Sequence, residues 1–213
     1  RIKMRNSEGL GEYKKYHKSQ IPNTNMSTAT QLQEGQVLIQ NSRIGYPKLY
    51  KAEGIKGDAT SKPRYGCQIY LPKSDEATKA KIDKEITRLS KLHFKGVKPK
   101  SKDLCLKDGD GEDGDENTVG CWIISTNRAE SQGRPQVVDR KQKPIDSADA
   151  DTVYAGAVCN FLVSFFVPKN WAKITASLEI VQFVKNGERI GAPRPVADQV
   201  MPELPEEEEE FEA

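Results

Sequence analysis

Alternating hydrophobic and polar positions dominate the middle of the chain and predict a mainly β protein. Apolar side chains recur at every second position in several short runs, which is the period of a half-buried strand. Ordered structure is expected to begin near residue 36. The predicted strands cover residues 37–39, 43–50, 65–71, 119–126, 136–139, 153–167 and 174–184.

Residues 74–92 form the one segment with a clear helical period. Ile82, Ile86 and Leu89 recur at helical spacing and make a narrow apolar stripe, while lysines crowd the other faces. Ser74 is the expected N-cap because two acidic residues follow it in the first turn, where the helix dipole favours them. Many strands with one helix predict an OB-fold-like, partly open β-barrel with elaborated loops.

The net charge of +2 conceals an uneven distribution. Residues 203–213 hold seven Glu and no base, which leaves residues 1–202 with 33 Lys and Arg against 24 Asp and Glu, a net charge of +9. A basic body with an acidic tail points to a polyanionic partner. We expect a disordered extension over 1–25 that is foreign to the fold or acts as a basic arm, a binding domain over 26–191, and a Pro-rich linker with a disordered acidic tail over 192–213.

Cofactor and catalytic motifs are not found in the sequence. The four cysteines are far apart and the two histidines lack metal-ligand spacing, so no metal or cofactor is predicted. Cys67, Cys121 and Cys159 lie in strand-like runs, where a free thiol behaves as a small core hydrophobe. No apolar run approaches the ~20 residues that span a membrane. We therefore expect a non-enzymatic protein of a reducing cytosol, with no membrane partner.

An acidic, glycine-rich loop at 108–115 is the only stretch that resembles a metal site. Counted from Asp108, the sixth and twelfth positions of a calcium loop would be Asp113 and Val119, where Gly and Glu are needed. The motif fails, and a solvated hairpin loop is the simpler interpretation. A metal-dependent nuclease that uses these acids is kept as an alternative function.

Basic residues are interleaved with aromatic residues along the predicted strands and loops. Lys169 and Trp171 are one such pair. Single-stranded DNA binding needs this combination, because cations follow the phosphates and rings stack on bases. Each aromatic ring could instead belong to the core, and each basic side chain could be a solvated surface charge. Two of the candidates lie near the tip of a polar hairpin predicted over 125–139. The DNA-binding candidates are Arg43, Tyr46, Arg64, Tyr65, Trp122, Arg128, Arg134 and Lys141.

The acidic tail is the most specific feature of the sequence. A run of glutamates self-repels and stays disordered, and its charge spacing imitates a polyanion. Such a tethered segment can compete with DNA for a basic groove and, once displaced, recruit partner proteins. A tail that only improves solubility is the alternative. The residues of this segment are Glu206, Glu207, Glu208, Glu209, Glu210 and Phe211.

Several stretches of the chain resemble one family. They are residues 41–50 (NSRIGYPKLY) and 63–73 (PRYGCQIYLPK), followed by shorter stretches at 106–110, 120–122, 134–139, 154–156 and 181–188. In these the chain resembles the single-stranded DNA-binding proteins of tailed bacteriophages, a family formerly described as a domain of unknown function. The resemblance covers most of residues 36–190.

The resemblance implies an OB fold that binds and protects single-stranded DNA without sequence preference in phage replication and recombination. The tail is similar to that of podovirus single-stranded DNA-binding proteins, which implies contacts with a polymerase or a helicase-primase and leaves a homodimer open. It also implies that the protein acts in the cytoplasm of the infected bacterium. A single-strand annealing recombinase, which also binds single-stranded DNA, is kept as an alternative function.

Overall fold

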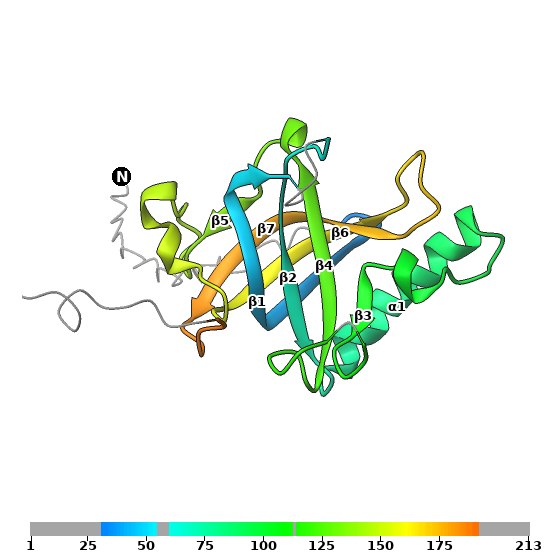
Figure 1. The fold of residues 1–213 in the computed structure, drawn as a ribbon, viewed down its shortest axis with the longest axis horizontal. Coiled ribbons are helices and arrows are strands. Elements are labelled where there is room, and N and C mark those ends of the chain that lie inside the picture. Colours follow the sequence, from blue (N-terminus) through cyan, green and yellow to red (C-terminus); the bar gives the residue numbers. More distant parts are fainter. Residues whose placement is uncertain (1–30, 55–59, 113, 192–213) are drawn as a thin grey trace, which may run out of the picture. The chain divides into compact units, whose positions relative to one another are not determined.

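The computed structural model describes residues 31–54, 60–112 and 114–191, which form a seven-stranded sheet with one long helix (Figure 1). The predictions for 1–25 and for the tail lie outside these residues. The helix α1 covers Glu76–His93 and follows the second strand. Short 3-10 helices cover Ser101–Asp103, Glu130–Gln132 and Ser147–Thr152. The strands are β1 (Gln36–Glu53), β2 (Arg64–Pro72), β3 (Leu106–Asp108), β4 (Cys121–Ala129), β5 (Gln136–Val138), β6 (Val158–Phe166) and β7 (Thr175–Lys185).

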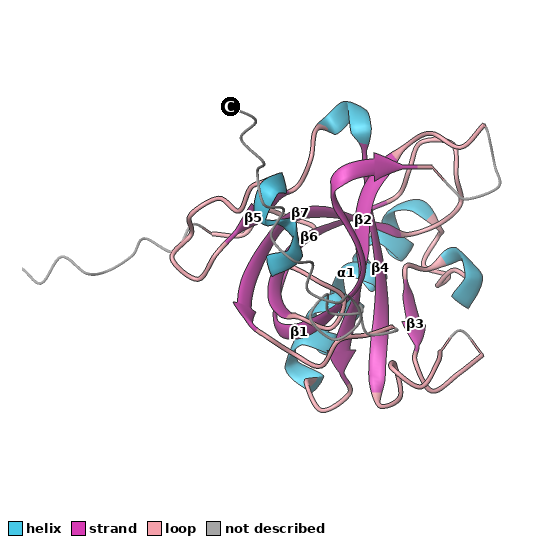
Figure 2. Ribbon diagram, turned by 60° about the vertical axis from the view of Figure 1, so that its left-hand side comes forward, coloured by secondary structure: helices cyan, strands magenta, loops and turns pink. Residues whose placement is uncertain are grey.

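Five of the strands close into a barrel in the order β1, β2, β4, β7, β6. All neighbours around this ring are antiparallel except β4 and β7, which are parallel and close the ring through one pair, Thr126 with Ala176. The strands β3 and β5 extend the sheet beside β4 and β7. Figure 2 shows β2 and β4 side by side, with β3 beyond β4. The predicted OB-type barrel is therefore confirmed, and this one residue pair closes the ring that was expected to be partly open.

The first barrel strand differs from its prediction, because the two expected strands are one strand of 18 residues. It pairs with β6 through its first half and with β2 through its second half. Asn41 and Tyr46 have positive φ angles of 51° and 45°, and the pairing register shifts near both. These bulges bend β1 from one side of the barrel to the other. The first bulge, at Asn41, falls in the gap between the two expected strands.

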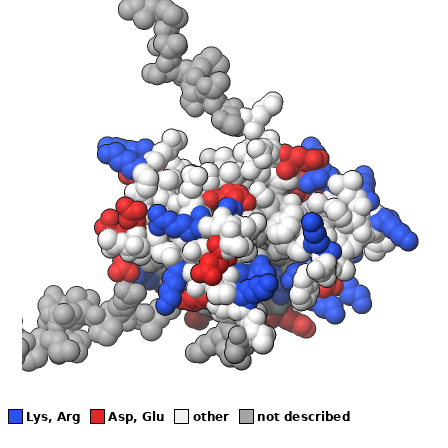
Figure 3. Space-filling model, turned by 90° about the horizontal axis from the view of Figure 1, so that it is seen from above, with Lys and Arg blue, Asp and Glu red and all other residues white. Residues whose placement is uncertain are grey.

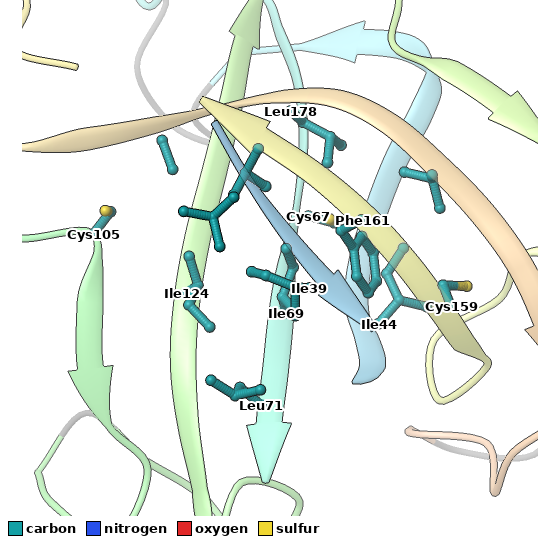
Figure 4. Packing of buried hydrophobic residues seen from close by; sticks show 14 of the residues in the cluster. Ile39, Ile44, Cys67, Ile69, Leu71, Cys105, Ile124, Cys159, Phe161 and Leu178 are labelled. Carbon is teal, nitrogen blue, oxygen red and sulfur yellow. The ribbon is translucent and has the colours of Figure 1, made fainter. Parts of the chain in front are cut away.

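The core lies inside the barrel and continues under α1 (Figure 4). Ile69, Ile124 and Phe161 point inward from three different strands and are fully buried. All four cysteines are free and buried, as expected for the three in strands. Burial raises the pKa of the Cys67 thiol to about 12, so this group stays protonated and packs as an apolar side chain.

The helix keeps its predicted apolar stripe but begins one residue later than expected. Ile82, Ile86 and Leu89 are buried against the barrel. The N-cap is Asp75 rather than Ser74, because the Thr78 backbone N–H donates to Asp75 Oδ1 at 3.0 Å. That hydrogen bond lowers the pKa of the Asp75 carboxyl. Within the described residues no helix is both long and apolar enough to cross a membrane.

Candidate nucleic-acid interface

A groove runs across one end of β2 and β4, between the β1–β2 loop and the β6–β7 loop. It consists of two adjoining hollows of about 540 and 630 Å³, which share Ser61, Lys62, Arg64 and Asn127. We call the two together the groove. Its side-chain lining comes from Tyr46, Lys48, Glu53, Ser61, Lys62, Arg64, Tyr65, Cys67, Gln68, Ser125, Thr126, Asn127, Phe166, Pro168, Trp171, Lys173 and Thr175.

Three large rings of the groove are open to solvent. Trp171 is 64% exposed, Tyr46 59% and Phe166 38%, which is unusual for large apolar side chains. Tyr46 owes its position to the second bulge of β1, where it adopts the left-handed backbone conformation that non-glycine residues rarely take. Such outliers concentrate at functional sites. The groove therefore offers flat surfaces that the core does not use.

Positive charge exceeds negative charge along the groove. Its lining includes the cations of Lys48, Lys62, Arg64 and Lys173 and one carboxylate, Glu53. Glu53 lies 3.0 Å from the Lys48 ammonium, which neutralises that pair. The Arg64 guanidinium donates to Asn127 Oδ1 at 2.8 Å and keeps its charge. A net positive groove of this kind attracts an anionic chain.

The floor of the groove, on β2 and β4, carries no charged side chain. Gly66 lies where β2 and β4 approach so closely that a Cβ would stand 2.3 Å from the Thr126 carbonyl oxygen. Glycine is therefore required there for the pairing itself. Gln68 and Ser125 complete the floor on the two strands. This uncharged floor adds no carboxylate that would repel an anionic chain.

Trp122 and Arg128, both predicted for DNA binding, lie elsewhere and are already engaged. Trp122 is half-buried against the core, and the ammonium groups of Lys73 and Lys79 lie 4.9 and 4.5 Å from its ring centre. Arg128 lies on β4 rather than at a hairpin tip. Its guanidinium forms an ion pair with Glu179 of β7 and donates to the Gly133 carbonyl oxygen at 2.9 Å.

The other three predicted residues outside the groove are spread over the surface. Arg43 donates to the Asn117 carbonyl oxygen at 2.5 Å, next to the acidic loop. Arg134 lies 5.8 Å from the ring centre of Tyr50 and 3.5 Å from Asp146. Lys141 is exposed in the turn after β5. Of the eight predicted residues, the structure brings Tyr46, Arg64 and Tyr65 together in the groove.

The acidic loop is organised around a lysine. The Lys73 ammonium lies 2.5 Å from Asp108 Oδ1 and 2.6 Å from Asp110 Oδ2, and the Gly120 backbone N–H donates to the other oxygen of Asp110 at 2.6 Å. The lysine lowers the pKa of both carboxyls. These are two of the carboxylates that the nuclease hypothesis assigned to a metal ion, and the Lys73 ammonium already lies between them.

Five cations and rings of the groove were missing from the sequence-based set: Lys48, Lys62, Phe166, Trp171 and Lys173. Trp171 stands in the β6–β7 loop, and the Lys173 ammonium lies 4.6 Å from its ring centre. The sequence already places Trp171 beside Lys169 as an aromatic and basic pair, but neither is among the eight candidates. Lys62 lies two residues before Arg64 and could have been chosen with it. Phe166 carried no comparable signal, because only the fold brings it beside Arg64.

The five-stranded barrel defines an OB fold. The groove crosses the second and third strands of this barrel and is flanked by the loops after the first and fourth strands. This is the surface on which OB folds bind oligonucleotides and oligosaccharides. The sequence profile of the family described as Enterobacter phage Enc34, ssDNA-binding protein matches residues 35–211. The chain belongs to this family.

Individual relatives agree with that assignment. Protein p50 of Acyrthosiphon pisum secondary endosymbiont phage 1 is 28% identical over 167 residues, which cover 71% of this chain and 84% of that protein. The single-stranded DNA-binding protein from bacteriophage Enc34, solved in complex with ssDNA, is 26% identical with a TM-score of 0.65, over 76% of this chain and 97% of that chain. The single-stranded DNA-binding protein gp2.5 encoded by bacteriophage T7 shares the fold, at 15% identity and a TM-score of 0.51, over 81% of this chain and 96% of that chain.

Proposed function

We propose that this protein binds single-stranded DNA without sequence preference and without catalysis, in the groove. The observation that carries the proposal is the coincidence of exposed rings and unneutralised cations on the OB-fold binding surface. The family and the Enc34 complex with ssDNA support the same ligand. Rings stack on any base, and a groove that relies on them does not distinguish sequences.

In this proposal the two kinds of side chain have separate tasks. Tyr46, Tyr65 and Trp171 stack on bases, each contributing about 1–3 kcal/mol. Lys62, Arg64 and Lys173 neutralise phosphates and release counterions. Binding is therefore expected to weaken steeply as salt rises.

The acidic tail is proposed to compete with DNA for the groove. The last described residues run over the outer face of the barrel, where Ile190 packs against Tyr70 and Ile123 of β2 and β4. Tyr70 is four residues from Gly66, about 13 Å along the strand. Residues 192–213 can extend to roughly 70 Å, so the glutamates can reach the groove at high effective concentration.

The biological role proposed for the chain is protection of single strands during phage replication and recombination in the host cytoplasm. DNA that fills the groove releases the tail, which then recruits a polymerase or helicase-primase. Surface plasmon resonance with a purified replicative polymerase of the phage tests recruitment. We expect association by the full chain with DNA bound, and loss of it when residues 203–213 are removed. Equal association by both forms would overturn recruitment through the tail.

DNA binding itself is tested by fluorescence anisotropy with labelled oligonucleotides of mixed sequence, between about 50 and 200 mM salt. We expect similar affinities for unrelated sequences and a steep loss with salt. Incubation of the same strands with magnesium or manganese should leave them intact. Absence of salt-sensitive association would overturn the proposal, and degradation of the strands would favour the nuclease.

The competition model is tested by comparing the full chain with a chain that ends at residue 202. Truncation is expected to tighten DNA binding at low salt, and the difference should shrink as salt screens the glutamates. A charge-neutral tail in which Glu206 to Glu210 are replaced by Gln serves as the matched variant of equal length. Unchanged or weaker binding by both variants would remove the competition model.

A further inference from the structure

A lysine-rich segment follows the second half of α1 and lies outside the groove. Residues 91–102, here called the connector, contain five lysines and no acidic residue. All five side chains are exposed, and none forms an ion pair with another described residue. Some lysines elsewhere are paired, as Lys73 is with Asp108 and Lys79 is with Asp83. The lysines of the connector are Lys91, Lys95, Lys98, Lys100 and Lys102.

The backbone holds both ends of the connector in place. At its start the Phe94 and Gly96 N–H groups both donate to the Ser90 carbonyl oxygen, at 2.9 and 3.0 Å, which ends the helix in a tight turn. At its far end the Ile174 N–H donates to the Asp103 carbonyl oxygen at 2.9 Å, and the Cys105 N–H donates to the Ile174 carbonyl oxygen at 3.0 Å. The lysines are therefore presented on an anchored segment.

That far anchor connects the connector with the groove. Ile174 ends the β6–β7 loop, whose Trp171 and Lys173 line the groove. Ala172 of the same loop faces the other way and lines a third hollow of about 530 Å³ together with the connector. In Figure 3, Lys and Arg side chains gather on the right of the view, the side on which Figure 1 shows the end of α1. One loop thus separates two basic hollows.

We infer that the connector is a second contact for single-stranded DNA, which receives the strand after it passes Trp171. The inference rests on the proposed function, since the groove must deliver the strand. Lysines suit this task because an ammonium attracts phosphate as a point charge without requiring one geometry. The third hollow also offers apolar surface to a base, from the half-buried ring of Phe94 and from Val97, which is 69% exposed.

In this inference the connector lengthens the path of the DNA strand, so it contributes to the affinity for long oligonucleotides and not to the affinity for short ones. The test replaces Lys95, Lys98, Lys100 and Lys102 with Gln in the full chain and measures binding to oligo-dT of about 8 and about 20 nucleotides. For the long strand we expect at least a tenfold loss of affinity at low salt and a salt slope reduced by about 2–3, since each phosphate contact contributes about 0.7. Affinity for the short strand should stay within twofold.

A matched variant replaces four exposed lysines outside the groove and the connector, namely Lys51, Lys81, Lys84 and Lys185, with Gln. This variant changes the net charge by the same amount as the connector variant. It should lower the affinity for both oligonucleotides equally and only slightly. If the connector variant behaves like this control, or if it binds the long strand as well as the parent chain does, the connector is not a DNA contact. A parent chain that binds neither oligonucleotide would overturn the proposed function, and this inference with it.

Discussion

The groove and the cluster of Trp122 with Lys73 and Lys79, here called the Trp122 cluster, contain the same residue types but present them in opposite ways. In the groove, Trp171 is 64% exposed and the Lys173 ammonium lies against its ring. In the cluster, two ammonium groups cover Trp122, and carboxylates pair with both of them. The first arrangement leaves ring and charge available to a ligand, and the second uses both to hold α1 and the acidic loop against the barrel.

The difference shows that pairing, and not composition, separates a binding surface from a structural one. A lysine whose charge is matched by an aspartate gains little from a phosphate, because binding would first have to break the existing pair. A ring covered by two side chains cannot stack on a base. Interleaved basic and aromatic residues are therefore an incomplete criterion until the carboxylates around them are located.

The strongest test of the comparison removes two groove rings. Replacing Tyr46 and Trp171 with Ala is expected to cost about 2–6 kcal/mol of DNA-binding free energy, since each stacked base contributes about 1–3 kcal/mol. Thermal unfolding should change little, because both side chains are exposed. Anisotropy titration and a melting curve measure the two quantities. Phe at both positions should restore most of the affinity, and an Ala variant that binds normally would remove stacking from the proposal.

The reciprocal variant, Trp122→Ala, should affect stability instead of binding. Truncating a fully buried tryptophan costs about 3–5 kcal/mol, and because this ring is half-buried we expect about 2–3 kcal/mol from denaturant unfolding. DNA affinity of the folded protein should remain that of the parent chain. A loss of affinity as large as that caused by Trp171→Ala would show that the two rings are equivalent after all.

The helix that carries Lys79 also depends on its cap. Asp75→Ala is expected to destabilise the protein by about 1 kcal/mol at neutral pH. The pKa of Asp75 is lowered in the folded protein, so its contribution is present above its ordinary pKa of 3.8 and is lost as pH falls through the lowered folded value. Urea unfolding of both proteins at several pH values checks this. Asp75→Asn keeps a cap oxygen and should lose less. A difference in stability between the parent chain and Asp75→Ala that does not shrink as the pH falls below 3.8 would contradict the assignment.

The smallest expected effect concerns a single cation on each side of the comparison. Arg64→Gln should reduce the salt slope of DNA binding by about 0.7 and lower affinity a few-fold, because one phosphate contact is lost. Lys79→Gln should leave the slope unchanged, since that ammonium already lies 2.5 Å from Asp83 Oδ2. Anisotropy at four or more salt concentrations resolves the two slopes. Equal slopes for the two variants would place Arg64 outside the DNA path.

The fold was largely predictable because its strands and helix carry strong local periodicity. The apolar stripe of α1 and the alternation over β2 needed no tertiary information. The continuity of β1 was not predicted, because the polar residues around Asn41 interrupt the apolar pattern and only the pairing with β6 shows that the strand continues through a bulge there. The closure of β4 on β7 also depends on residues about 50 positions apart.

The groove was predictable only in part, for a different reason. Tyr46, Arg64 and Tyr65 lie on adjacent strands, and their chemistry was visible along the sequence. Arg128 looked equally suitable, but its partner Glu179 lies on another strand, and the ion pair forms only after the barrel closes. Phe166 seemed to belong to a buried strand, but as the last residue of β6 it lies beyond the core. Long-range pairing thus decided which charges and rings remained available.

The single backbone bridge between β4 and β7 has a consequence for motion. Side-chain contacts supplement it, through the hydrogen bond from Asn127 Nδ2 to Thr175 Oγ1 at 3.0 Å and the Arg128–Glu179 ion pair. Local opening is easiest where few backbone hydrogen bonds must break, so amide protons along this seam should exchange before those between β1 and β2. Asn127 and Thr175 also line the groove. We therefore expect the groove to widen along this seam more readily than the rest of the barrel opens.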